Sequence, residues 1–139
     1  MLGVSTYAPA FIASCQQQLD EELAKFNALI AAAKGTKAEA ALAAFTPDYL
    51  KSMVQALDHM FMHRLRGKEG KDGNPCNEVR MLAVSILEHG GMMTADKTIK
   101  YVASKSVTGI AVGEAIVLTA ESFGKLADAY FAEIAAKFM

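Results

Sequence analysis

Apolar residues recur at helical spacing along most of the chain, and this pattern predicts a mainly α-helical fold. In the first segment, residues 7–33, they stand seven positions apart, with further apolar residues between them. This arrangement predicts a long helix with a narrow apolar stripe. The stripe consists of Ile12, Leu19, Leu23, Phe26, Ile30 and Ala33. Gly35 ends the helix, and we expect a short Ala-rich helix over residues 37–44.

Two proline-containing pairs predict the starts of the next helices. A Thr-Pro pair at residues 46–47 and an Asn-Pro pair at residues 74–75 each place a capping side chain before a proline. The first pair predicts a helix that extends to Gly67. The second predicts a helix over residues 75–89, which is apolar on nearly all sides. We therefore expect this helix to be the most buried one.

The segment from about residue 92 to residue 118 departs from the helical pattern. It contains β-branched residues separated by Ser, Gly and Lys, which predicts a β-hairpin or a small three-stranded sheet. After it, Thr119 provides a cap for a last helix whose apolar residues recur every three or four positions up to Phe138.

These elements predict a bundle of four principal helices around the helix 75–89, with the small β element before the last helix. A length of 139 residues is typical of one domain. We therefore expect a single helical domain over residues 1–139, in which residues 92–118 form a small β-containing insertion.

Composition excludes several classes of protein. Hydrophobic residues make up 53% of the chain and charged residues 21%, which excludes an intrinsically disordered chain. The formal net charge of −1 gives no strong overall field, so we do not expect a nucleic-acid partner. No stretch reaches the ~18 consecutive apolar residues of a membrane span, and we expect no membrane partner. With two cysteines and no convincing export signal, the sequence indicates a cytoplasmic protein.

The block from His63 to Arg80 carries most of the candidate chemistry. It is rich in glycine and has five basic against three acidic residues. Its glycines let the backbone approach a ligand, and the N–H groups that begin the following helix favour an anion. We expect a phosphate or carboxylate to bind here, or an anionic partner. The candidate binding residues are Arg64, Arg66, Lys68, Lys71, Asn74, Glu78 and Arg80. The alternative is a solvated loop whose mixed charges serve solubility.

Arg64 is the least ordinary residue of this block. It stands seven positions after Leu57 and so falls inside the apolar stripe of the expected helix. A buried guanidinium needs a carboxylate, and Glu78 and Asp72 are the nearest candidates in the sequence. Arg64 is then either part of a structural salt bridge or a ligand contact, unless its side chain reaches water at the helix end.

Two histidines raise the alternative of a metal site. His59 and His63 stand four positions apart on one helix face, which is a spacing that zinc ligands use. A third ligand would come from Asp58, Cys76, Glu88 or His89. The simpler interpretation is that both histidines are surface residues without a metal, so we expect no cofactor and keep zinc as the alternative.

Cys76 falls in the first turn of the helix 75–89, where the helix dipole lowers the pKa of a thiol. Together with a histidine it could act as a nucleophile. Because that helix is so apolar, a buried and inert cysteine is the other interpretation.

The apolar stripe of the first helix is longer than one short partner helix needs. Met62 in addition falls outside the core stripe of its own helix. Both features indicate a homodimer.

The sequence therefore predicts a binding or regulatory module of mainly α fold. In this hypothesis the loop 63–80 holds an anionic small ligand or partner. The alternatives are a small enzyme that depends on a metal or on a Cys/His pair, and a structural homo-oligomer without a ligand.

Overall fold

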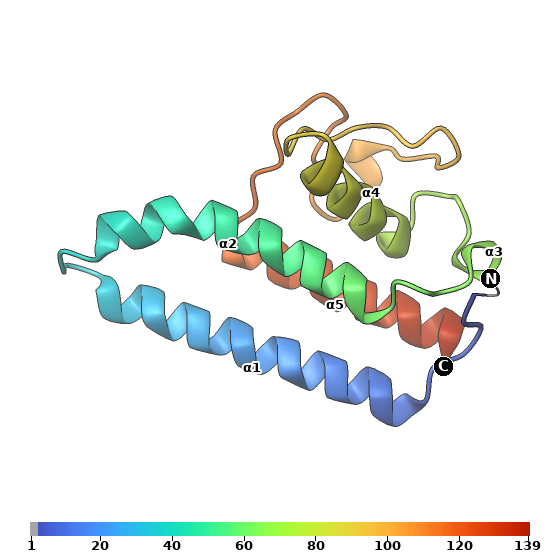
Figure 1. Cartoon of the computed structure of the whole chain (residues 1–139), viewed down its shortest axis with the longest axis horizontal. Coiled ribbons are helices and arrows are strands. Elements are labelled where there is room, and N and C mark those ends of the chain that lie inside the picture. The colour runs from blue at the N-terminus through green and yellow to red at the C-terminus, as the bar shows by residue number, and fades with distance from the viewer. Residues whose placement is uncertain (1–2) are drawn as a thin grey trace.

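The structure, a computed structural model, describes residues 3–139 and is mainly helical (Figure 1). Its elements in chain order are α1 (Pro9–Ala33), α2 (Glu39–Met60), α3 (Arg66–Glu69), α4 (Pro75–Glu88), the 3₁₀ turn η1 (Ala103–Lys105) and α5 (Ala120–Phe138). The long helices α1, α2 and α5 pack together, and α4 lies across α2 and α5 (Figure 1). The segment before α1 runs beside the end of α5, where the Tyr7 N–H donates to the Phe138 carbonyl at 2.6 Å.

The predicted central position of α4 is wrong. α4 packs on α2 and α5 from one side, while α5 packs against α1, α2, α3 and α4. On the outer face of α4, the Leu87 residue is 75% exposed and Val84 is 42% exposed. The apolar residues of α4 on that face are not core residues, because the volume at the centre of the fold is filled by α5.

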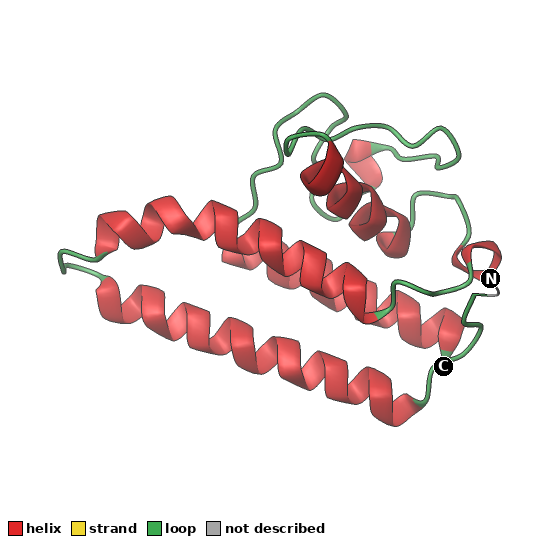
Figure 2. Ribbon diagram, viewed as in Figure 1, coloured by secondary structure: helices red, strands yellow, loops and turns green. Residues whose placement is uncertain are grey.

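The predicted β element is also wrong. No strand or sheet forms within residues 3–139 (Figure 2), and only two isolated bridges pair residues, Val4 with Arg64 and Met92 with Ala115. Between α4 and α5, apolar side chains enter the core one at a time from an irregular loop. These are Met93, Ile99, Ile110, Ile116 and Leu118. The apolar runs of this loop are short and do not pair as strands. A side chain holds part of the loop instead.

That side chain is Glu78 of α4, which is 1% exposed. Its carboxylate accepts the backbone N–H groups of Val107 and Thr108, both at 2.9 Å, and the Thr108 hydroxyl at 2.6 Å. A carboxylate therefore satisfies the backbone donors that a neighbouring strand would otherwise satisfy. Glu78 is a structural residue here and not a free ligand-binding group.

Pro47 does not start a helix but lies inside α2. The Thr46 hydroxyl donates to the Leu42 carbonyl at 2.8 Å, so it binds the preceding turn instead of capping a new helix. The expected helix 37–44 and the start of the next one are therefore one continuous element. α2 then ends at Met60, earlier than predicted, and this leaves Arg64 in a loop.

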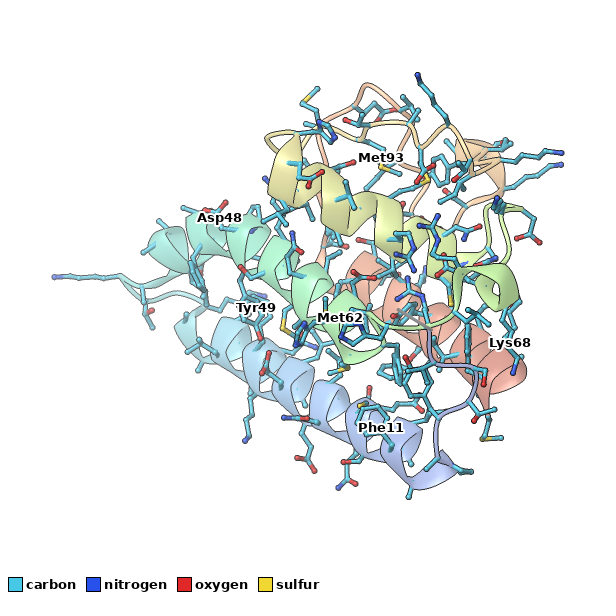
Figure 3. All side chains as sticks on the ribbon, turned by 45° about the vertical axis from the view of Figure 1, so that its right-hand side comes forward. Phe11, Asp48, Tyr49, Met62, Lys68 and Met93 are labelled. Carbon is cyan, nitrogen blue, oxygen red and sulfur yellow. The ribbon has the colours of Figure 1, made fainter. Side chains whose placement is uncertain are left out.

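Most of the apolar stripe of α1 lies in the internal core, but Ile30 near its end is 37% exposed. Ile12, Leu19 and Phe26 are each at most 6% exposed within one copy of the chain. The buried positions of the stripe thus need no partner subunit, and the homodimer stays a prediction. Met62, just beyond the end of α2 (Figure 3), is 44% exposed.

The α1–α2 hairpin projects beyond the start of α5 (Figure 1). This overhang leaves a mainly apolar pocket of about 420 Å³, with walls from α1, α2 and the residues before α5. Ile30 and Leu42 are among its lining residues, and it is the uncovered apolar surface that still supports the predicted homodimer. Within the described chain, no helix is both long enough and apolar enough to cross a bilayer.

Replacement of Glu78 by Ala should release the loop 106–110. Two backbone N–H groups would lose their acceptor, so we expect the free energy of unfolding to fall by about 1–3 kcal/mol. Amide hydrogen exchange at Val107 and Thr108 should become faster than in the unmodified protein. Glu88→Ala, which removes an exposed carboxylate from the same helix, is the matched control. Unchanged exchange at both amides in Glu78→Ala would contradict the assigned role.

Candidate functional site

Arg64 lies at the centre of a buried polar network. It is 2% exposed and follows α2 in the loop that leads to α3. Its hydrogen-bond acceptors are Glu69 Oε1 (2.6 Å from Nε), the Phe61 carbonyl and the Tyr130 hydroxyl (both 3.0 Å from Nη1), and the Cys76 carbonyl (3.1 Å from Nη2). Asp58 adds an ion pair, with its Oδ1 3.1 Å from Nη1. One guanidinium thus connects α2, α3, α4 and α5.

Glu69 is the second centre of this network and is fully buried. Besides Arg64, it accepts Nε and Nη2 of Arg80 at 3.1 and 2.6 Å, and Nδ2 of Asn77 at 2.7 Å. Burial alone would raise the pKa of the Glu69 carboxyl. The hydrogen bond from Arg80 and the charges of Arg64 and Arg80 outweigh burial and hold that pKa below its usual value. Glu69 is therefore ionised in the folded protein at neutral pH.

The sequence identified the buried guanidinium but not its partner. Arg64 does pair with carboxylates, yet its main partner is Glu69 and not Glu78 or Asp72. Glu78 holds the loop before α5, and Asp72 accepts hydrogen bonds from Asn74. Glu69 was overlooked because it stands in a glycine-rich, charged segment that resembles a solvated loop. The feature that could have identified Glu69 as the partner is its position five residues after Arg64, with one helical turn between the two residues.

Asn74 is also a structural residue. Its side chain caps α4 by accepting the Asn77 N–H at 3.1 Å, and it donates to the Glu69 carbonyl at 2.8 Å. At Gly73 the neighbouring loop packs closely against the backbone of Lys100. A Cβ on Gly73 would lie 2.5 Å from the Lys100 carbonyl oxygen, so this position requires glycine.

The two lysines of the block lie apart from its arginines. Lys68 (Figure 3) donates from Nζ to the Ser5 carbonyl at 2.6 Å, and its ammonium lies 5.7 Å from the centre of the Phe138 ring. Lys71 is exposed, and its carbonyl accepts the Lys100 N–H at 2.9 Å. Neither lysine lines the two pockets described next.

Arg66 and Arg80 line a pocket of about 320 Å³, here called the first pocket. Its walls come from α3, from α4 and from the loop that follows α4. The other lining residues are Met81, Val84, His89, Thr94, Ala95, Asp96 and Lys97. Cationic groups thus face an apolar wall and a single carboxylate. The sequence does not indicate Lys97, and it indicates His89 only as a metal ligand, because the irregular loop that brings both to this pocket has no local signal.

A second pocket, of about 310 Å³, shares Arg66 and Arg80 with the first. Its other lining residues are Gly3, Met62, His63, Arg64, Leu65 and Gly67. The two arginines therefore stand between two adjoining pockets. Arg80 is held there by its two hydrogen bonds to Glu69, whereas Arg66 is exposed and has no ion pair among residues 3–139.

Asp96 is the carboxylate that lines the first pocket, and its surroundings lower its pKa. Hydrogen bonds from the Thr98 hydroxyl and N–H are the main causes that lower the pKa of Asp96. The charges of Arg66 and Arg80 lower it further, in keeping with the position of both side chains on the lining of this pocket.

The predicted metal ligands do not come together with a third group. His59 and His63 are exposed, and only His63 lines the second pocket. Across residues 3–139, no group of three or more His, Cys, Asp or Glu side chains is placed to hold a metal ion. The zinc alternative thus has no geometric support.

Cys76 is buried, and its surroundings oppose thiolate formation. Burial is the main cause that raises the pKa of this thiol to about 12, and the positive charge of Arg64 compensates only in part. At neutral pH the thiol is protonated, and the lowering expected from the helix dipole does not prevail.

Comparisons of the chain with family models, with curated proteins and with solved structures found no match.

Glu69→Gln tests the network. Removing this carboxylate leaves the buried Arg64 without its main counter-ion, so we expect the free energy of unfolding at pH 7 to fall by about 3–5 kcal/mol. Glu88→Gln, an exposed change, should shift it by less than about 0.5 kcal/mol. Urea denaturation measures both values, and equal losses in the two variants would contradict the network.

The pH dependence provides a second measurement on Glu69. Because its pKa is lower in the folded than in the unfolded chain, its contribution is complete above the unfolded value of about 4.5. The contribution is lost as the pH falls below 4.5 towards the folded pKa. Between pH 7 and pH 3 the unmodified protein should therefore lose more stability than Glu69→Gln. Parallel curves would show that Glu69 does not titrate as assigned.

Proposed function

We propose that this chain is a binding module for an anionic ligand, which it holds where Arg66 and Arg80 meet. Three cationic side chains, Arg66, Arg80 and Lys97, line one pocket, and this observation carries the proposal. The buried network beside the pocket holds Arg80 in place. Of the predicted ligand residues, Arg66 and Arg80 keep that role. The two lysines lie outside both pockets, and the residues that belong to the scaffold are Arg64, Asn74 and Glu78.

The electrostatics of the pocket favour an anion. Arg80 uses Nε and Nη2 on Glu69, which leaves Nη1 with no hydrogen bond to the described residues. Arg66 and Lys97 are exposed, so their charges are available to a ligand. Asp96 opposes an anion, but one of its oxygens already accepts two hydrogen bonds from Thr98. The network and the first pocket together contain three carboxylates, Asp58, Glu69 and Asp96. They contain four cations, Arg64, Arg66, Arg80 and Lys97.

The network also lowers the cost of binding. A long arginine side chain normally loses rotamer freedom when it grips a ligand. Arg80 has already lost that freedom, because Glu69 holds its guanidinium in a bidentate arrangement. The ligand thus meets a pre-organised donor. The alternative of an enzyme that uses a metal or Cys76 has no comparable support in the described part of the chain.

Thermal unfolding with added anions tests this function. Phosphate at 100 times its dissociation constant should stabilise the protein by about 2.7 kcal/mol, whereas sodium chloride of equal ionic strength should not. The double substitution of Arg66 and Lys97 by Ser should remove the stabilisation by phosphate while leaving the midpoint of the ligand-free protein nearly unchanged.

Lys125→Ser is the matched control, because Lys125 is an exposed cation on α5 outside both pockets. It should keep the full response to phosphate. If neither phosphate, sulfate nor citrate raises the midpoint of the unmodified protein, the proposed function is wrong.

A further inference from the structure

The two pockets adjoin at Arg66 and Arg80, and this arrangement restricts the shape of a ligand. Each pocket, at about 320 and 310 Å³, is within the size range of small-molecule sites. An inorganic anion at the arginines would leave both pockets largely empty. An anion with a single substituent would fill one of them.

Each pocket also has its own apolar wall. Met81 and Val84 line the first pocket, and Met62 and Leu65 line the second. Val84, Met62 and Leu65 are 42%, 44% and 38% exposed. Apolar side chains on both sides of the two arginines match a ligand with an organic group on each side of its charge.

We propose that the ligand is a phosphodiester, with its phosphate at Arg66 and Arg80 and one organic substituent in each pocket. This inference rests on the proposed function and specifies its ligand class. A diester carries one negative charge at neutral pH and places it between two substituents. A phosphomonoester carries more charge and has only one substituent.

The relative affinities of a monoester and a diester therefore distinguish binding by charge alone from occupation of both pockets. If cations alone set the affinity, the monoester binds more tightly because of its greater charge. If both pockets are occupied, the diester binds more tightly, since its second substituent covers Met62 and Leu65. We expect an advantage for the diester of about tenfold in dissociation constant.

Two matched pairs of compounds make the measurement by isothermal titration calorimetry. One pair is a dinucleoside monophosphate and its nucleoside monophosphate. The other is glycerophosphoglycerol and glycerol 3-phosphate, which keeps the single negative charge of a diester and tests a lipid headgroup as the source. An advantage for the diester in either pair supports the proposal and identifies the source of the substituents.

Failure of this inference is distinguishable from failure of the proposed function. If phosphate and both monoesters bind, but neither diester binds more tightly than its monoester, the phosphodiester is ruled out and anion binding stands. If none of these compounds nor inorganic phosphate binds, both proposals are overturned.

Met62→Ser separates the two pockets. It should remove most of the diester's advantage and leave the affinity for the monoester unchanged, because Met62 lines only the second pocket. Leu29→Ser, at a residue 55% exposed on α1, is the matched control and should change neither affinity. An equal loss for both esters in Met62→Ser would contradict the placement of the second substituent.

Discussion

The buried ion pair between Arg64 and Glu69 is the interaction on which the rest of this structure depends. Removing both charges from water costs several kcal/mol for each ion, so the pair is tolerated only where almost every donor finds an acceptor. Arg64 meets that condition through carbonyl, hydroxyl and carboxylate oxygens that come from four helices or their ends. The relative positions of these helices are thereby constrained by a single side chain, and displacement of α3 or of the start of α4 would leave Nε or Nη2 of Arg64 without its acceptor.

The same pair determines the chemistry at the surface. Glu69 also binds Arg80, so the network extends from the interior to the junction between the two pockets. Lys137 Nζ and Asn74 Nδ2 both donate to the Glu69 carbonyl at 2.8 Å, which fixes the backbone of the one-turn helix α3. Arg66 begins that turn, and its place beside Arg80 thus follows from interior contacts. In this account, the scaffold and the binding site are two ends of one polar network.

Local sequence patterns predicted much of the helical structure. The bounds of α1, α4 and α5 follow from apolar spacing and from caps, and Thr119 does form a capping box with Ser122. The irregular segments could not be predicted in this way. Whether residues 92–118 pair as strands depends on what packs beside them, and Glu78 supplies that partner from a helix. Likewise, burial of Arg64 was expected from its position in an apolar stripe, but the choice of Glu69 over Glu78 depends on the path of the loop. The pocket draws Lys97 and His89 from the segment after α4, a contact with no signal in either stretch of sequence.

The side-chain Nε–H signals of the arginines, measured by nuclear magnetic resonance at pH 7, test the link between scaffold and site most directly. The Nε–H protons of Arg64 and Arg80 should exchange slowly, because both donate to Glu69, and that of Arg66 should exchange fast. Added phosphate should shift the signals of Arg66 and Arg80 and leave that of Arg64 in place. A fast-exchanging Nε–H on Arg80, or a phosphate-induced shift at neither Arg66 nor Arg80, would contradict the claim that the buried pair positions an anion site.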